Sequence, residues 1–296
     1  MKKLTPVLLL SFVNVIGFSI LIPVLPEVLE LLTGKSSGLL YGLLLSSYAF
    51  SQFLAAPILG SLSDHYGRRP ILLISQFGTM VSWIIFASAY FIPRDAMLGS
   101  ISIPILVIAI SRITDGLTGG NISVASAWVS DRTTHEEKTK AFGLVGATFG
   151  VGFLIGPALG GFSVSTPIHF LGTAILAFAI SLVTLGFIYW GLPESLSDEH
   201  RTSGQELSFM NHLNFSKKFK LFRDNDVIKN LVWVRVFFSL AFVGFTTSLI
   251  LLLGRTYELT PINIGIIMSV IGVFSILNQS TVVPRLAKRF GNFQAF

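Results

Sequence analysis

The amino-acid sequence predicts an all-α protein, a polytopic bundle of transmembrane helices. Three observations carry this prediction: long apolar runs, few charged residues, and basic residues gathered on one side of the predicted membrane. Charged residues form 12% of the chain, about half the share typical of soluble domains. A helix of about 20 apolar residues crosses a bilayer with its backbone hydrogen bonds satisfied internally. The short alternating segments typical of transmembrane barrels do not occur in the sequence.

Eight apolar runs predict eight membrane-spanning helices. The first follows Lys2 and Lys3, as in a signal peptide, but no cleavage site of small residues follows it. The run instead continues into Pro23 and Pro26, which favours a first transmembrane helix. The runs cover residues 5–25, 38–62, 70–92, 101–129, 141–163, 168–191, 229–253 and 262–284.

The basic residues predict the orientation. With the N-terminus in the cytoplasm, sixteen Lys and Arg residues lie on the cytoplasmic side and three in the outer loops. This bias follows the positive-inside rule, so we expect a multi-pass protein of a bacterial inner membrane or a plasma membrane. The same topology explains the net charge of +6 without a nucleic-acid partner.

The longest polar stretch, residues 192–228, separates the sixth and seventh runs. It opens on Leu-Pro-Glu-Ser, where Pro193 ends the preceding helix. Its later part interleaves phenylalanines with basic residues, which fits either a helix lying on the inner membrane surface or a solvated linker.

The segment 60–72 between the second and third runs is rich in information. Gly60 and Gly67 bracket Asp64, and Arg68 and Arg69 follow. In a tight turn we expect Asp64 to cap a helix N-terminus, while the two arginines reach a carboxylate on a neighbouring helix. An ordinary basic hairpin would explain the arginines, but not the glycine and aspartate spacing.

This segment resembles the signature G-x-L-a-D-r-x-G-r-r-x-x-l of the major facilitator superfamily, with His65 as its one departure. Residues 52–59 are similar to the drug:proton antiporter branch, which includes tetracycline exporters. In that family the signature holds the two halves of the transporter together as a conformational latch. The resemblance therefore implies latch residues at Gly60, Asp64, Gly67, Arg68 and Arg69, with Asp131 as their acidic partner.

The fourth run carries an ionisable pair. Arg112 and Asp115 share one helical face with Gly116, Gly119 and Ser123. Charges inside a membrane are costly and usually functional, although an ion pair that only locks packing would give the same pattern. The string resembles the superfamily's R-x-x-Q-G motif, which is linked to proton coupling, with Asp115 where an uncharged residue is usual.

The first run is similar to the family's D-x-x-G…P-x-L-P segment, but Asn14 replaces its aspartate. An amide cannot carry a proton, so we expect proton binding at Asp115 with Arg112 as its partner. The alternative is a carrier without proton coupling, in which Asn14 hydrogen-bonds the substrate. Tyr48 and Gln52 share a face of the second helix. They line a predicted cavity with Asn14, Arg112 and Asp115, or form only interhelical hydrogen bonds.

Glycines recur every four residues in the fifth run, at Gly152, Gly156 and Gly160. This spacing predicts a groove in which another helix backbone approaches closely. Pro157 permits a kink. With Gly161, the string resembles the motif G-x-x-x-G-P-x-x-G-G, which in this superfamily is characteristic of exporters.

The organisation predicted is a complete six-helix half and part of a second. We expect an N-terminal bundle over 1–192, a cytoplasmic loop over 193–228 and a partial bundle over 229–296. Residues 284–291 align with 60–67 as a degenerate repeat. Since facilitators have two six-helix halves, a C-terminally truncated chain is expected; the alternative is a natural eight-helix protein.

Together these features predict a monomeric transporter that exports a small lipophilic compound or drug in exchange for protons by alternating access. Two alternatives remain: an uptake carrier for a sugar or other metabolite, and a non-transporting or inactive membrane protein. No enzymatic constellation, metal site or cofactor is expected. The chain has no cysteine, which excludes disulfides and thiol catalysis.

Overall fold

A computed structural model describes residues 4–34, 37–197, 226–277, 281–282 and 285. The all-α prediction is confirmed, since seven helical segments are long and apolar enough to cross a membrane, and an eighth apolar helix over Pro261–Phe274 is shorter. The predicted surface helix or linker within 198–225 and the repeat at 284–291, apart from Arg285, lie outside the described residues. The helices are α1 (Thr5–Ser19), α2 (Leu21–Thr33), α3 (Gly38–Tyr66), α4 (Arg68–Ser88), the short 3₁₀ helix η2 (Ala89–Phe91), α5 (Ile103–Gly119), α6 (Ile122–Asp131), α7 (His135–Val164), α8 (Phe170–Gly191), α11 (Asp226–Thr256) and α12 (Pro261–Leu277).

The first span is longer than the apolar run predicts and consists of α1 and α2 joined at Ile20. It ends at Gly34, whose φ of 66° closes the helix in the left-handed region. The next helix begins after Ser37, whose side chain accepts a hydrogen bond from the backbone of Leu40 at 3.3 Å.

The fourth span is also divided, into α5 and α6, at Gly120 and Asn121. Glycines let this span approach α3 closely. A Cβ atom at Gly120 would lie 2.9 Å from the backbone nitrogen of Ala56, and one at Gly116 would overlap the Tyr48 carbonyl. The loop before α5 forms a small antiparallel hairpin of β1 (Met97–Leu98) and β2 (Ile101–Ser102), which the sequence did not indicate.

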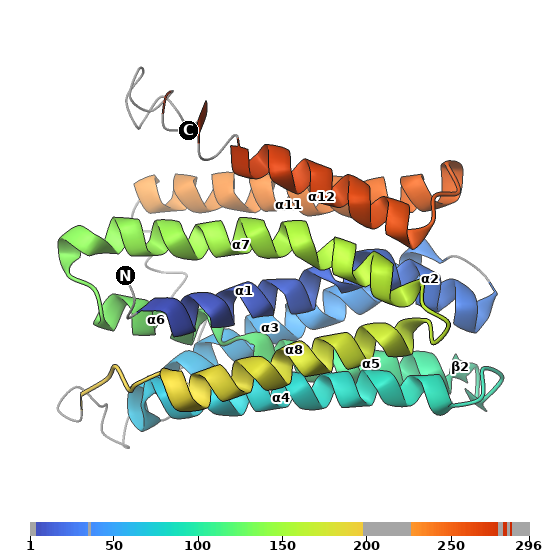
Figure 1. Ribbon diagram of the computed structural model, residues 1–296, viewed down its shortest axis with the longest axis horizontal. Coiled ribbons are helices and arrows are strands. Elements are labelled where there is room, and N and C mark those ends of the chain that lie inside the picture. Colours follow the sequence, from blue (N-terminus) through green and yellow to red (C-terminus); the bar gives the residue numbers. More distant parts are fainter. Residues whose placement is uncertain (1–3, 35–36, 198–225, 278–280, 283–284, 286–296) are drawn as a thin grey trace.

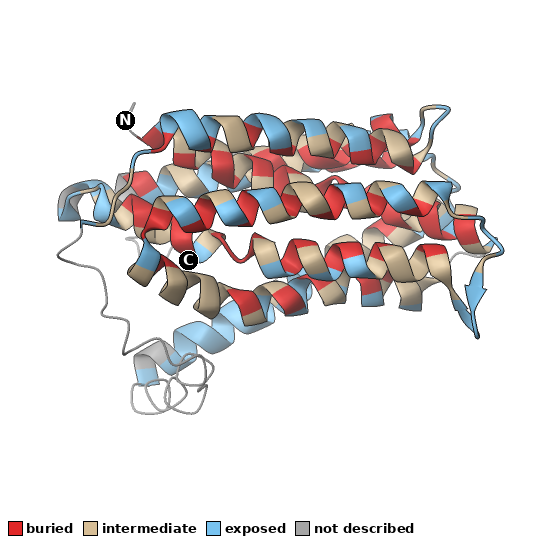
Figure 2. Cartoon of the chain, turned by 90° about the horizontal axis from the view of Figure 1, so that it is seen from below, coloured by how far each residue is buried: buried red, intermediate tan, exposed pale blue. Residues whose placement is uncertain are grey.

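The helices run roughly parallel in one bundle, with α1 and α2 near its centre (Figure 1). The helix α7 packs on α1, and α12 packs on α7, while α4 lies beside α8 and α5 on the other side. Buried residues concentrate in the first six spans, whereas α11 is mostly exposed (Figure 2). The most apolar window of the first span is 67% buried and that of α11 only 6%.

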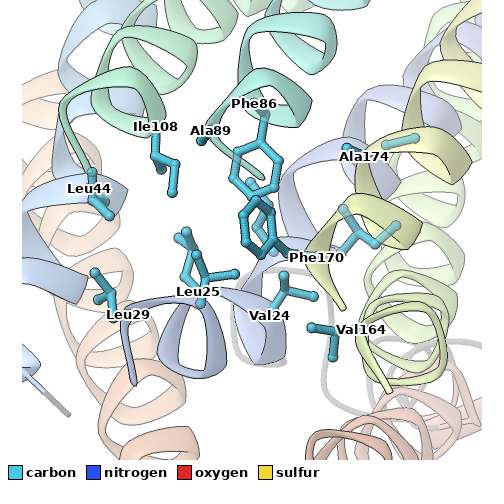
Figure 3. Packing of buried hydrophobic residues seen from close by; sticks show 14 of the residues in the cluster. Val24, Leu25, Leu29, Leu44, Phe86, Ala89, Ile108, Val164, Phe170 and Ala174 are labelled. Carbon is cyan, nitrogen blue, oxygen red and sulfur yellow. The ribbon is translucent and has the colours of Figure 1, made fainter. Parts of the chain in front are cut away.

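Two apolar clusters fill the ends of the bundle. At the end that carries the β1–β2 hairpin, Phe86 and Phe170 meet edge to face at 5.7 Å, with Val24 and Leu25 beside them (Figure 3). At the other end, Leu4, Ile71, Trp128 and Leu192 belong to a second cluster. On the first and fourth spans, polar side chains occupy the stretch between these two clusters.

Candidate functional site

A layer of polar side chains lies between the two apolar clusters. On the first span it falls between Leu10 and Ile20, and on the fourth between Ile108 and Val124. A polar side chain buried in an apolar bundle is costly unless it has a hydrogen-bond or ion-pair partner. The site is therefore described by these pairings.

The ion pair predicted on the fourth span is formed. Arg112 Nη1 lies 3.1 Å from Asp115 Oδ2, one helical turn away, and the two side chains are 2% and 6% exposed. Arg112 Nη2 also donates to Ser111 Oγ at 3.1 Å, and its guanidinium lies 4.9 Å from the Trp83 ring centre. The arginine is therefore held by a carboxylate on one side and an aromatic face on the other.

Asp115 borders a small cavity enclosed by the first, second, third, fourth and sixth spans. The cavity measures about 10 Å³, room for about one water molecule. Asn14, Tyr48, Gly119 and Ser181 also line it. A site for a drug-sized molecule typically needs 300–1,000 Å³, so the helices must separate before such a molecule fits.

The structure therefore brings together only some of the residues that the sequence predicts to line a cavity. Asn14, Tyr48 and Asp115 line the cavity, whereas Gln52 and Arg112 do not. Gln52 Nε2 donates to the Gly119 carbonyl at 2.9 Å and to Tyr48 Oη at 3.1 Å, so the Gln52 side chain, on α3, links α3 to α5.

Sequence reasoning missed Asn121, which is fully buried. Asn14 Nδ2 donates to Asn121 Oδ1 at 2.8 Å, joining the first span to the break between α5 and α6. The Asn121 Nδ2 atom has no hydrogen-bond partner among the described residues. The sequence signal was the Gly-Gly-Asn string, in which two glycines weaken the helix just before a polar residue.

The segment 60–72 forms a compact charge cluster at the other end of the bundle. Arg68, with a side chain only 9% exposed, pairs with Asp64 at 2.5 Å and with Asp131 at 3.2 Å. It also donates to Ser63 Oγ at 2.6 Å. The expectation that Arg68 reaches a carboxylate on a neighbouring span is confirmed, and Asp131 is that carboxylate.

The cap on α4 is Glu194, and the prediction that Asp64 caps a helix was wrong. The Glu194 carboxylate accepts from the backbone N–H groups of Arg68 and Arg69 at 2.9 and 3.1 Å. Asp64 lies instead inside the last turn of α3. Gly67 is required here because its φ is 100° and a Cβ atom would overlap the Glu194 carboxylate.

Glu194 also accepts from the backbone of Ser195 and Leu196, at 2.8 and 3.0 Å. Burial by itself would raise the pKa of Glu194, but these backbone donors together with those of Arg68 and Arg69 stabilise its charged form, and its pKa lies below the usual value. The string Leu-Pro-Glu-Ser was interpreted only as a helix stop, and its role as a cap was missed.

Arg69, for which the sequence predicts a carboxylate partner, pairs with none of the carboxylates that the structure describes. Its Nη2 donates to the Tyr189 carbonyl at 2.6 Å, and its guanidinium lies 5.8 Å from the Tyr189 ring centre. Nearby, Trp128 Nε1 donates to the Pro193 carbonyl at 2.9 Å, and Ser195 Oγ donates to Asp131 at 3.0 Å. The end of the sixth span is thus bonded to both the third and fourth spans.

The glycines of α7 make the predicted close helix contact. A Cβ atom at Gly152 would lie 2.9 Å from Val15 Cβ, one at Gly156 would overlap Ser19, and one at Gly160 would overlap the Ile20 carbonyl. Their common partner is the first span, at the junction of α1 and α2.

The same helix meets α12 through a second set of backbone contacts. Gly161 faces the Pro261 carbonyl, and Gly265 of α12 faces the Pro157 carbonyl. Ser269 Oγ also donates to the Leu154 carbonyl at 2.9 Å. The helix α7 therefore packs closely on the first span through three of its own glycines, and on α12 through its Gly161 and through Gly265 of α12.

Over the described part of the chain, no group of three or more His, Asp or Glu side chains has the arrangement of a metal site. The chemistry of the polar layer rests on its ion pair, amides and hydroxyls.

Comparison with known proteins identifies what this arrangement resembles. A family model described as Major Facilitator Superfamily matches residues 7–296. The class H tetracycline resistance protein of Pasteurella multocida is 31% identical over 295 residues, which cover 98% of this chain and 68% of that protein. The class C protein of Escherichia coli is 32% identical, covering 95% of this chain and 66% of that protein. The chain thus spans about two thirds of the length of these relatives.

Solved structures share the fold. The human organic anion transporter MFSD10 (TETRAN) superimposes with a TM-score of 0.73 and 24% identity, covering 95% of this chain and 71% of that one. A D-xylose-proton symporter gives a TM-score of 0.64 at 16% identity, covering 98% and 69%. At these identities the likeness speaks for the fold alone.

Proposed function

Because the chain belongs to the major facilitator superfamily, we propose that it is a secondary active exporter that moves a small lipophilic compound out of the cell in exchange for protons. The observation that carries the proposal is the buried Asp115 at a cavity enclosed by five spans, in a chain about 31% identical to tetracycline resistance proteins. Tetracycline is accordingly the first compound to test.

Asp115 is the proposed proton carrier. Among the described residues that line the cavity it is the one acid, and Asn14 supplies an amide where an acid is common in the family. Protonation of the carboxylate would remove its charge-assisted bond to Arg112 and so weaken the polar layer. This change gives proton binding a means to alter helix packing.

The direction of transport is proposed from two features. The glycine string of α7, from Gly152 to Gly161, resembles the exporter motif, and several relatives are named for drug resistance. The fold alone does not decide the direction, since the D-xylose-proton symporter shares it.

The organisation of the transporter follows the same proposal. Residues 1–192 form one half, 193–228 the loop between halves and 229–296 part of the second half, with the N-terminus in the cytoplasm. The cluster of Arg68, Asp64 and Asp131, together with the Glu194 cap, stabilises the cytoplasmic end of the first half and serves as the conformational latch. The protein acts as a monomer.

The test is tetracycline flux in proteoliposomes driven by an imposed pH gradient. Asp115→Asn keeps the size of the side chain but cannot bind a proton, so we expect gradient-driven flux to be largely lost. Asp115→Glu should retain part of the flux. Asp95→Asn, the same change in an exposed outer loop, is the matched control.

Unchanged gradient-driven flux for Asp115→Asn would contradict the assignment and favour Asn14 as a substrate ligand in a carrier without proton coupling. Accumulation in the uptake direction would support the metabolite carrier instead. Absence of flux in the unaltered protein, with a normal melting curve, would support a non-transporting protein.

A further inference from the structure

A second hollow lies between α4 and α8 and is lined by other residues than the cavity at Asp115. It is an open groove of about 800 Å³ lined by apolar and aromatic side chains. Ile74 and Phe77 form one wall, and Val183 and Phe187 the other, each more than half exposed. The two helices lie side by side along this face (Figure 1).

One end of the groove carries aromatic residues typical of the membrane–water boundary. Tyr189 and Trp190 are 58% and 85% exposed and lie in the last turn of α8. The Trp190 ring packs across Gly186, where a Cβ atom would lie 2.9 Å from it. Tyr and Trp prefer the level of the lipid headgroups, so this end of the groove reaches the boundary.

The same end carries a positive charge, Arg69, that has no counter-ion among the described residues. Arg69 lies against Tyr189, which lines the groove, and no described carboxylate pairs with its guanidinium. Its Nε atom is buried and has no hydrogen-bond partner among the described residues. The neighbouring Arg68, by contrast, takes both Asp64 and Asp131.

We propose that this groove binds an anionic phospholipid, with an acyl chain along the apolar walls of α4 and α8 and the phosphate on Arg69. The apolar walls fit an acyl chain and the aromatic end fits the headgroup region. The Arg69 guanidinium, which pairs with no described carboxylate, fits the negative charge of a phosphate. The transported compound is a weaker fit, since the cavity at Asp115 lies inside the bundle and this groove opens to the bilayer. A second copy of the chain is also a weaker fit as the occupant of the groove, because it would have to place an acidic side chain next to Arg69.

The experiment uses Trp190 as a reporter of bound lipid. Trp83 and Trp128 are 1% and 0% exposed, so Trp233→Phe leaves Trp190 as the exposed tryptophan of the described residues. In this background the protein is placed in vesicles containing brominated phosphatidylglycerol or brominated phosphatidylcholine. Bromine quenches tryptophan fluorescence on contact, so the ratio of the two signals measures preference for the anionic lipid.

We expect a preference of about fivefold for phosphatidylglycerol, the effect of one basic residue near the membrane surface. Arg69→Gln should bring the ratio close to one. Lys229→Gln, which removes a positive charge at the start of α11, should leave it unchanged. Val183→Phe, which fills the groove, should reduce quenching by both lipids.

Equal quenching by the two lipids, or a ratio unchanged by Arg69→Gln, would overturn the headgroup assignment. Unchanged quenching in Val183→Phe would overturn the assignment of the acyl chain to the groove. Quenching that falls as protein concentration rises, with dimers seen by cross-linking, would give the groove to a second copy. The measurement needs no transported compound and no pH gradient, so its failure leaves the proposed export function untouched.

Discussion

The contact between Glu194 and the start of α4 leads to a quantitative prediction. Glu194→Gln should loosen the end of the sixth span from the segment 60–72, because it removes the charge that faces the N-terminus of α4. Glu194→Ala should have a larger effect, because it removes every hydrogen bond of the side chain.

The structure sets the size of the effect. Glu194 Oε1 accepts from the backbone of Arg68, Ser195 and Leu196, whereas Oε2 accepts from Arg69 alone among the described residues. Glutamine keeps one oxygen and hence three of these bonds, but loses the fourth bond and the charge. Since the side chain is only half-buried, solvent screening reduces the charge contribution, and we expect a loss of about 1 kcal/mol in the free energy of unfolding for glutamine and about 2 kcal/mol for alanine.

The dependence on pH identifies the cause. The pKa of Glu194 in the folded protein lies below its usual value, so the carboxylate stabilises the fold above about pH 4.3, the pKa of an unperturbed glutamate. That stabilisation disappears as the pH falls through the folded-state pKa. The difference between the natural protein and Glu194→Gln should be full at pH 7 and shrink below about pH 4.

Two measurements test this prediction in detergent. Melting curves followed by tryptophan fluorescence give the stability difference, and Trp128, which bonds the Pro193 carbonyl, reports locally. Because the chain has no cysteine, Leu196→Cys provides a single thiol whose labelling rate should rise in the Glu194→Gln background. Glu30→Gln, at an exposed position near the other end of the bundle, is the control.

Equal melting and labelling for glutamate and glutamine at pH 7 would refute the reasoning. A difference that persists unchanged at pH 3 would show that charge is not its cause.

Two further predictions concern packing. Gly160→Val should lower the melting temperature and the yield of folded protein, because the new Cβ atom would overlap the Ile20 carbonyl. Gly146→Val is the control and should have little effect, because no atom lies near its Cβ position. Equal effects of the two changes would argue against the close contact. Phe86→Ala should cost about 3–5 kcal/mol in chemical unfolding, because this fully buried ring packs edge to face on Phe170. A cost below about 1 kcal/mol would show that the cluster around Phe86 and Phe170 is not tightly packed.

Much of the fold follows from apolar length and charge placement, because a bilayer leaves a backbone few choices. The spacing of Gly152, Gly156 and Gly160 also predicted the helix contact that the structure contains, since a four-residue repeat fixes a helical face. The breaks at Ile20 and at Gly120 were not predicted, because hydropathy does not distinguish a continuous helix from two helices in line.

Hydrogen bonds between residues far apart in the sequence were the hardest part of the site to predict. Glu194 caps a helix that begins 126 residues earlier, and Asn14 bonds a residue 107 positions away. Local reasoning instead assigned the cap to Asp64, which is close in sequence but already inside α3. A polar residue's local pattern indicates that it needs a partner, but the packing of the helices selects which one.

The paired contacts of Gly161 with Pro261 and of Gly265 with Pro157 have a mechanical consequence. Where two backbones touch without intervening side chains, no rotamer change can absorb a displacement. The helices α7 and α12 must then roll or slide on each other as rigid rods at this point, or separate altogether. Any rocking of one part of the protein against the other would therefore pivot at this helix crossing. The stiffness of the crossing could then be altered only by the side chains that flank it.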